Sequence, residues 1–506
     1  MIDPCTPVLV GVGQVADSVD DLDYRQWSSV DLATVAARRA VDDTAADYAT
    51  VAASVEVVAG VRQFEISAPV PAPLGRSDNY PRSVARRMGI DPGHAVLEVV
   101  GGQGPQHLVT EFASAIAAGR LESVLLVGSD AISTERFYAG RADKPDFTEA
   151  IGGQLEDRGF GYESFLDENL IRHAAVSPPT QYGLLENARR ARLGATPAEY
   201  RMRMAELFAP FTCVAAKNPL AGSQVVRSAA ELATVTASNR MICDPYPRLL
   251  VARDLVNQGA AVVLMSVSKA RELDVPQEKW VYLRGHCDLV EQPLLERVDL
   301  GGAPTATMAA REALRVAGIG LDDIAAFDLY SCFPIAVFNF CEGMDLPTDD
   351  PRGLTVTGGL PFFGGPGNNY SMHAIAEIVS RMRERPGDFG LVGANGGIMS
   401  KYSVGVYSTA PADWVPDRAP ALQQAVSDLP SVDVRPRAEG AARIETYTAR
   451  AESGTGVGLV IGRMVADDTR FLAAIDPESL GAVGDPIGQD IVVTAGENGN
   501  SAVMRN

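Results

Sequence analysis

Positive charge is scarce in this sequence. Lys and Arg together number 44 against 64 Asp and Glu, so the formal net charge of the 506 residues is −20. A surface with this imbalance repels nucleic acid and anionic membranes, and we expect neither as a partner. An anionic substrate would therefore need a local basic patch within the acidic surface.

Long hydrophobic runs, cysteine pairs and histidine clusters are also missing. Residues 260–265, one of the longest apolar runs, are far fewer than the ~20 of a membrane span, so we expect no span. The six cysteines form no CxxC motif, which predicts a reducing, cytoplasmic location without disulfides. The five histidines lack metal-ligand spacing, so we expect no metal site.

An internal repeat organises most of the chain. Short apolar strands, a helix-period segment and a glycine-rich turn recur in the same order and at a nearly constant offset. This recurrence predicts two copies of one α/β unit, each with a mainly parallel sheet. The matched pairs are 8–13 with 281–286, 35–40 with 308–313, 55–58 with 326–329, and 101–104 with 364–367.

The repeat also predicts how the chain divides into domains. The connection before the last strand of the unit is much longer in the first copy, which predicts an inserted loop domain at residues 129–255. The first half then covers 1–128 and 256–276, and the second half covers 277–410. Prolines and weak periodicity indicate a linker at 411–440. Short β-like segments broken by glycine predict a small OB-like barrel at 441–506.

Five arginines crowd into one part of the predicted insertion, and two interpretations of them stay open. They can form a solvated helix face that pairs with Glu186, Glu199 and Glu206. They can also form a phosphate-binding patch, which an acidic protein would need for an anionic ligand. The five are Arg189, Arg190, Arg192, Arg201 and Arg203.

Local motifs resemble the thiolase superfamily. The segment NQGAAVVLMS at 257–266, the segment PTQYGLLENA at 179–188 and the segment DLYSCF at 328–333 are similar to motifs of sterol-carrier-type thiolases. The resemblance covers about residues 5–410, and the tail resembles the extra C-terminal domain of type 1 thiolase-like proteins. It implies a five-layer α-β-α-β-α fold, an active site where the halves meet, and chemistry on acyl-CoA thioesters, with coenzyme A as ligand or substrate rather than cofactor.

The resemblance also implies that the usual catalytic side chains are missing. The nucleophilic cysteine of the family falls on Gly102, or on Gly101 if the register slips by one residue. The histidine of its GHP motif falls on Gly365, and its last cysteine within residues 393–396. A chain without that nucleophile would not form the usual covalent acyl-enzyme. Glycine turns at helix N-termini still favour an anion or a carbonyl oxygen, so Gly102, Gly365 and Gly396 are expected to line an acyl site.

Tyr330, Cys332 and His373 remain as candidate catalytic groups, and each has a structural alternative. Cys332 matches an acid/base cysteine of the sterol-carrier-type motif, but a buried cysteine is also common in a core. Tyr330 can equally be a core residue with a tethered hydroxyl. His373 can pair with Glu377 on a helix surface.

The resemblance leaves more than one function open. The first hypothesis is a CoA-binding or acyl-CoA-binding relative without ordinary thiolase activity, active in lipid metabolism or as a subunit. The alternatives are a retro-aldol lyase or an acyltransferase acting on an acyl-CoA or sterol-CoA thioester, so enzymatic activity is left undecided. The C-terminal domain could bind a protein partner. The expected ligand contacts are Arg189, Arg192 and Lys217 for the CoA phosphates. Asn368 and Asn369 are further candidates for substrate binding, but they can equally be turn residues that start the helix.

Overall fold

The two copies of the repeat form strands in the same spatial order in this computed structural model, which describes residues 2–450 and 456–505. The first copy gives the order β2-β4-β8-β1 and the second β10-β11-β12-β9. Pairing of β1 with β9 joins them into one ten-stranded sheet, which β3 and β5 extend. The strands are β1 (Pro7–Ala16), β2 (Val57–Gly60), β3 (His94–Leu97), β4 (Ser123–Ala131), β5 (Glu156–Asp157), β8 (Asn257–Ser266), β9 (Val281–Val290), β10 (Ile324–Leu329), β11 (Phe389–Gly396) and β12 (Lys401–Ser408).

Each copy is a mainly parallel sheet, as expected, with one antiparallel strand, which is β8 in the first copy and β12 in the second. β2 and β4 are parallel, as are β10 and β11, but the last strand of each copy runs antiparallel to both of its neighbours. Only residues 397–400 separate β11 from β12, and so short a connection allows only an antiparallel pair.

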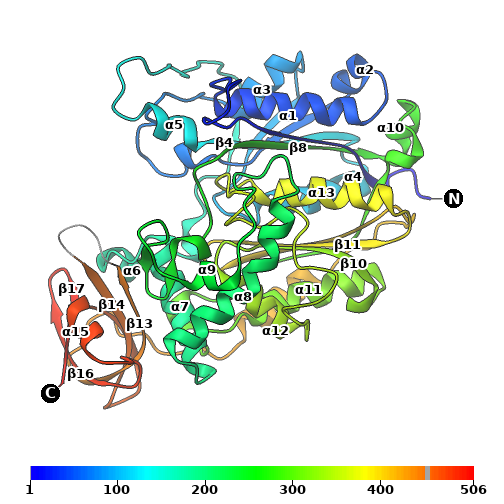
Figure 1. The fold of residues 1–506 in the computed structure, drawn as a ribbon. Coiled ribbons are helices and arrows are strands. Elements are labelled where there is room, and N and C mark those ends of the chain that lie inside the picture. Colours follow the sequence, from blue (N-terminus) through cyan, green and yellow to red (C-terminus); the bar gives the residue numbers. More distant parts are fainter. Residues whose placement is uncertain (1, 451–455, 506) are drawn as a thin grey trace.

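Helices cover both faces of each copy and produce five layers (Figure 1). The central layer contains α4 (Gly104–Ala117) and α13 (Tyr370–Glu384). The outer layer of the first half contains α1 (Ser29–Asp43) and α3 (Tyr80–Met88), and that of the second half α11 (Pro304–Ala317) and α12 (Pro334–Gly343). On β4, Leu126 packs into the core with α4, whereas its neighbour Leu125 packs into the core with α1. This alternation places every second β4 side chain in the central layer.

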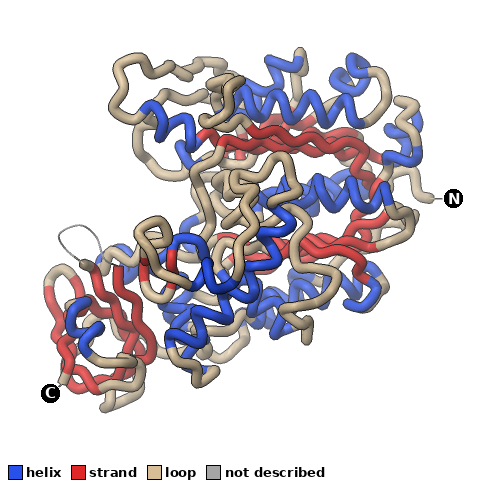
Figure 2. The backbone as a smooth tube through the Cα atoms, in the orientation of Figure 1, coloured by secondary structure: helices blue, strands red, loops and turns tan. Residues whose placement is uncertain are grey.

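The chain between β4 and β8 forms a group of helices that packs on the second half (Figure 2). Its longest members are α7 (Pro178–Arg192) and α8 (Pro197–Ala215), both of which contact α12. In residues 2–450 and 456–505, no helix has the length and apolarity needed to cross a membrane. The smaller elements are α5 (Ile132–Tyr138), α6 (Glu168–Arg172), α9 (Ala229–Ala233), β6 (Met241–Cys243) and β7 (Tyr246–Pro247), and outside this stretch α2 (Tyr48–Ala53) and α10 (Val267–Glu272).

The end of the chain is a closed five-stranded barrel in the order β13-β14-β15-β17-β16. A short helix, α15 (Pro477–Ala482), lies between the third and fourth strands in chain order, β15 and β16. This OB-like arrangement agrees with the prediction. The stretch expected to be a linker contains a helix, α14 (Ala419–Ser427), which packs on β9. The strands are β13 (Gly440–Arg450), β14 (Val457–Met464), β15 (Arg470–Ile475), β16 (Asp490–Gly496) and β17 (Gly499–Met504).

Buried polar contacts dock this barrel on α7. The Asn187 side chain donates to the Tyr447 carbonyl at 3.0 Å, and the Thr446 hydroxyl donates to the Leu184 carbonyl at 2.6 Å. Arg190, which is 1% exposed, forms an ion pair with Asp485 at 2.7 Å. One side of the barrel is therefore already occupied by the chain itself.

Candidate functional site

The two glycine turns meet in the central layer, where α4 and α13 begin. The Gly101 amide donates to Asn368 Oδ1 at 3.0 Å, and the Ser371 hydroxyl donates to the Gly102 carbonyl at 2.6 Å. Asn368 also donates to the Arg62 carbonyl at 2.7 Å, which ties the junction to the first half. The turns that the repeat singled out are therefore neighbours in space.

Tyr330 fills the space beside Gly102. A methyl group built on Gly102 would collide with the Tyr330 hydroxyl and ring, so no larger residue fits there without movement of the tyrosine. The Tyr330 amide donates to the Gly393 carbonyl at 2.9 Å, and its ring stands perpendicular to that of Tyr370 at 5.6 Å. Burial raises the pKa of Tyr330 well above its usual value, so the phenol stays protonated at neutral pH.

Gln103 fills the space beside Gly396 in the same way. A methyl group on Gly396 would collide with Gln103 Oε1, a buried atom that has no hydrogen-bond partner among the described residues. Gly365 differs, because the nearest atom to a methyl group there would be a Leu360 carbon at 3.4 Å. The Gly365 amide instead donates to the Arg253 carbonyl at 2.7 Å.

Cys332 lies in a buried cluster close to this junction. Its thiol donates to the Tyr182 hydroxyl at 3.3 Å, and Asn395 donates to the same hydroxyl at 3.1 Å. Phe333 stacks on Tyr182 with ring centroids 4.2 Å apart. Burial raises the pKa of Cys332 to about 12, so the thiol is protonated at neutral pH.

His373 is fully buried, and the expected surface pair with Glu377 does not form. Its Nδ1 lies 2.8 Å from Gln14 Oε1, and Gln14 in turn donates to Glu377 at 3.0 Å, so a glutamine bridges the two. Burial lowers the pKa of His373 to about 3, and the imidazole is neutral. Ring contacts through Phe363 and Tyr370 separate it from Tyr330.

Three of the five clustered arginines have carboxylate partners, and one of these, Arg190, pairs with Asp485 of the barrel. Arg189 and Arg192 both bind Glu342 of α12, at 3.0 and 2.6 Å, and Arg192 also reaches Asp299. These partners differ from the expected Glu186, Glu199 and Glu206, but they favour the structural interpretation over phosphate binding. Lys217 is exposed just beyond the end of α8.

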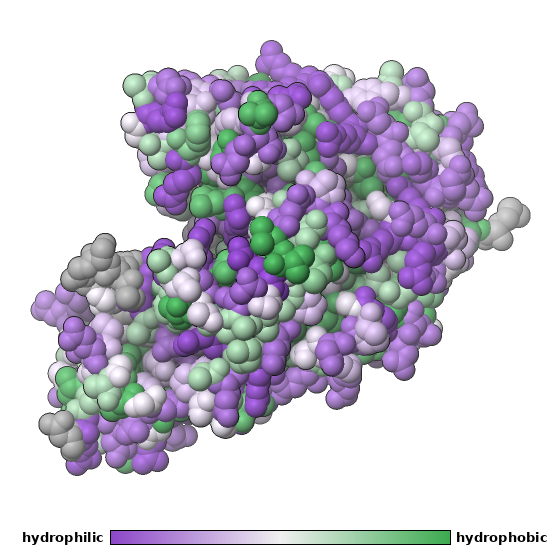
Figure 3. Space-filling model, in the orientation of Figure 1, coloured by the Kyte–Doolittle hydropathy of each residue, from purple (hydrophilic) through white to green (hydrophobic). Residues whose placement is uncertain are grey.

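A cavity of about 540 Å³ opens beside the second glycine turn. Two of its lining residues, Val256 and Gln258, are the side chains that a methyl group on Gly364 would meet. The Gly222 amide, also in the lining, donates to the Phe363 carbonyl at 2.7 Å. Figure 3 shows a mainly hydrophilic face that is hollowed between the first half and the barrel.

Arg253 places a guanidinium at this cavity, whose lining also includes Arg136, Asp20 and Asp21. Its Nε is buried without a hydrogen-bond partner among the described residues. Burial, and then the nearby charge of Arg248, lower its pKa, which means that the guanidinium is poorly solvated and gains from an anion. No sequence motif marks Arg253, although it lies just before the segment 257–266 that carries the thiolase resemblance.

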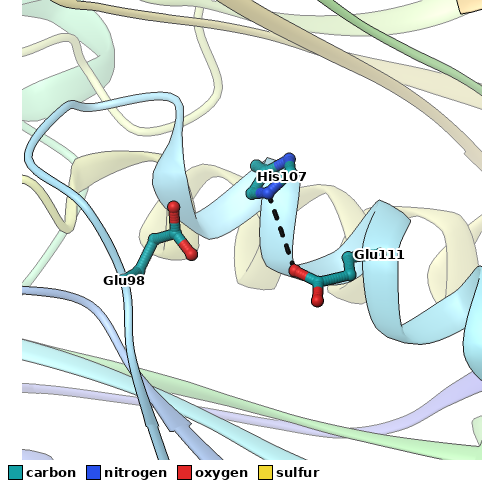
Figure 4. A group of neighbouring side chains, drawn as sticks. All are labelled: Glu98, His107 and Glu111. Atoms are coloured by element: carbon teal, nitrogen blue, oxygen red, sulfur yellow. Dashed lines mark ion pairs between the residues drawn. The ribbon is translucent and has the colours of Figure 1, made fainter. Parts of the chain in front are cut away.

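A second polar group lies beside the first glycine turn, with Glu98 before the turn and His107 and Glu111 on α4. Glu98, His107 and Glu111 hold their ligand atoms within 4.8 Å of one another (Figure 4). Arg158 donates to Glu98 at 2.7 Å and to Glu111 at 2.6 Å, so a cation already balances both carboxylates. We interpret the group as an ion-pair network.

Five layers and two facing helix N-termini define a thiolase-type fold, and comparison with known proteins agrees. The chain is 55% identical to a monomeric SCP2-thiolase-like protein type 1 from Mycobacterium smegmatis, with all of both chains covered and a TM-score of 0.86. Residues 421–497 match the family model of the thiolase-like protein type 1 additional C-terminal domain. The chain belongs to the type 1 SCP2-thiolase-like protein family.

More distant structures share the fold alone. An Ltp2-ChsH2(DUF35) aldolase is 20% identical, with 80% of this chain and 98% of that chain covered and a TM-score of 0.58. Human mitochondrial 3-ketoacyl-CoA thiolase is 15% identical, with 81% of this chain and 100% of that chain covered and a TM-score of 0.58. No curated protein matches the sequence.

Proposed function

We propose that this protein binds CoA or an acyl-CoA thioester and does not carry out ordinary thiolase chemistry. The observation that carries the proposal is the contact between Tyr330 and Gly102. The family resemblance puts the nucleophile at position 102, where the chain has no side chain and the tyrosine takes the space. A transferred acyl group would have neither a thiol to bond to nor room beside it.

Cys332 is a poor substitute nucleophile. Thiolate, not thiol, attacks a thioester, and a pKa of about 12 leaves almost no thiolate at neutral pH. The hydrogen bond to Tyr182 and the stacked Phe333 also hold the thiol inside a packed cluster. We therefore expect no covalent acyl-enzyme on this residue.

The cavity beside the second glycine turn is the proposed ligand site. Arg253 Nε has no hydrogen-bond partner there among the described residues, and Lys217 lies two residues before Pro219, which lines the cavity. Arg189 and Arg192 already bind Glu342, so we assign the CoA phosphates to Arg253 and Lys217 instead. The six free thiols suit a reducing compartment, and we keep a cytoplasmic location as part of the proposal.

Calorimetric titration with CoA, acetyl-CoA and a longer acyl-CoA tests this site. Binding should weaken about 10-fold or more in Arg253→Gln, because an arginine–phosphate contact is lost. The matched control is Arg192→Gln, which removes an arginine bound to Glu342 and should leave the affinity unchanged. Loss of binding in Arg192→Gln alone would return the phosphate site to the arginine cluster at 189–192. No binding of any of the three compounds to the wild-type protein would refute the proposal.

A retro-aldol lyase is the second candidate, because such a reaction needs an acid or base but no acyl nucleophile. The protonated Tyr330 phenol at the junction of the two turns is the observation that favours it. Tyr330→Phe should then abolish thioester cleavage while CoA affinity is retained. An activity that survives this substitution would exclude the tyrosine as the acid. An acyltransferase would instead require acylation of Cys332.

A further inference from the structure

Three buried side chains beside the second glycine turn, of which Gln258 lines the cavity, carry polar atoms without hydrogen-bond partners. The atoms are Asp130 Oδ2, Gln258 Oε1 and both side-chain atoms of Asn369, and no other described residue satisfies them. The three residues are only 2%, 1% and 1% exposed. A buried polar atom left unpaired costs about 1–3 kcal/mol, so this group favours a ligand atom or an ordered water.

The fold brings the three side chains onto one surface. Asp130 and Gln258 lie directly opposite each other on the antiparallel strands β4 and β8, so both point toward the central layer. Asn369 covers Gly128, which lies two residues before Asp130 on the same face of β4. Asp130 contacts Gly367 and Gln258 contacts Gly364, so the group converges on the turn that starts α13.

Gln258 connects this group to the cavity, and the orientation of its amide decides which ligand groups can bind to the group. Gln258 lines the cavity. Its Nε2 donates to the Leu220 carbonyl at 2.8 Å and to the Phe363 carbonyl at 3.0 Å, which sets the orientation of the amide. Its free Oε1 is therefore an acceptor, and only a ligand group that donates a hydrogen bond can satisfy it.

Asp130 complements this acceptor. Its Oδ1 accepts from the Phe64 amide at 3.0 Å, which leaves Oδ2 as the free atom. Burial raises the pKa of Asp130 well above its usual value, which favours the protonated carboxyl, and a protonated carboxyl can donate a hydrogen bond. A hydroxyl group both donates and accepts, whereas a carbonyl oxygen only accepts.

We infer that Asp130, Gln258 and Asn369 form a receptor for a hydroxyl group, so that the protein selects hydroxylated acyl thioesters. The inference rests on the proposed function, because it places the acyl end of the ligand in the same cavity. A ligand hydroxyl would donate to Gln258 and accept from Asp130 or Asn369. An oxo group at the same position would leave Gln258 Oε1 unsatisfied.

Titration with butyryl-CoA, 3-hydroxybutyryl-CoA and acetoacetyl-CoA tests the receptor. The wild-type protein should bind the hydroxylated compound about 10-fold more tightly than the other two. Asp130→Leu should bring the three affinities to within about 2-fold of one another, and the variant should bind butyryl-CoA as tightly as the wild-type protein does. Asn339→Leu is the matched control, since Asn339 is also buried and unpartnered among the described residues but lies on α12, in the outer layer of the second half.

Two other outcomes separate the receptor from the proposed function. Equal wild-type affinities for the three thioesters would overturn the receptor, with ordered water as its occupant, and leave CoA binding intact. No binding of any thioester would overturn both. If circular dichroism shows that Asp130→Leu does not fold, Gln258→Met gives the same comparison, and a retained preference for the hydroxylated compound in that variant would overturn the receptor.

Discussion

The Tyr330 hydroxyl occupies the space that any side chain on Gly102 would need. Gln103 does the same at Gly396, so two glycines at the junction are each matched by a polar side chain from another position. The two helix N-termini are kept together by Asn368 and Ser371 although the side chains expected from the family are absent. The site is thus repacked rather than left empty.

Gly102→Cys is therefore expected to destabilise the protein and not to restore a nucleophile. The new side chain collides with Tyr330, and overpacking of a core costs about 1–3 kcal/mol in the free energy of unfolding. In the double variant Gly102→Cys/Tyr330→Ala the clash is gone. Its loss in the free energy of unfolding should therefore be smaller than the sum of the losses in the two single variants. Urea unfolding of the four proteins measures this coupling, and strictly additive effects would contradict the contact.

Cys332 should resist alkylation in the folded protein. Its pKa of about 12 reduces the thiolate at pH 8 by about 10³-fold relative to an ordinary thiol, and the thiol is buried. Cys213 is exposed and serves as the internal control. Mass spectrometry after iodoacetamide, and separately after acetyl-CoA, should find Cys213 alkylated and Cys332 unmodified until urea unfolds the chain. An acetyl group on Cys332 of the folded protein would contradict the absence of a nucleophile.

The internal repeat made most of the fold predictable. Strand segments such as 8–13 and 281–286 lie at matching places in the two copies, and the β-rich tail forms the expected barrel. The antiparallel direction of β8 and β12 was not predictable from the alternation of strands and helices, because the residue pattern of a strand does not show its direction. α14 was missed because its 419–427 segment contains a proline and little apolar periodicity.

The site was less accessible to sequence reasoning. The glycine positions were visible as absent side chains, but the residues that fill them come from other segments and are brought there only by folding. The arginine cluster at 189–192 was visible as charge, whereas its partner Glu342 lies far along the chain. Arg253 and Asp130 are single residues without a motif, and their burial decides what they do.

Asp130→Asn should increase stability most at high pH. The raised pKa of Asp130 in the folded state comes first from burial, with a smaller contribution from the Glu135 charge. The stability that this carboxyl contributes is complete below its unfolded pKa of about 3.9 and is lost as pH rises toward the folded value. The amide does not ionise, so the advantage of the variant in the free energy of unfolding should grow as pH rises above the unfolded value of about 3.9, which urea unfolding at several pH values measures. An advantage that does not change with pH would show that the carboxyl is not protonated in the folded protein.

His107→Gln should lower stability at neutral pH and have no effect in alkaline solution. Burial lowers the pKa of His107, but the hydrogen bond to Asp288 and the charges of Asp288, Glu98 and Glu111 outweigh it and raise the pKa to about 9. A raised folded pKa stabilises the protein fully below the unfolded value of about 6.5, and this contribution disappears as pH rises through 9. The imidazole is about one-third exposed, so solvent screening limits the expected loss to about 1 kcal/mol at pH 6. Thermal unfolding of the wild-type protein and the variant between pH 6 and 10 measures the difference, and curves that stay parallel across this range would show that His107 is neutral in its network.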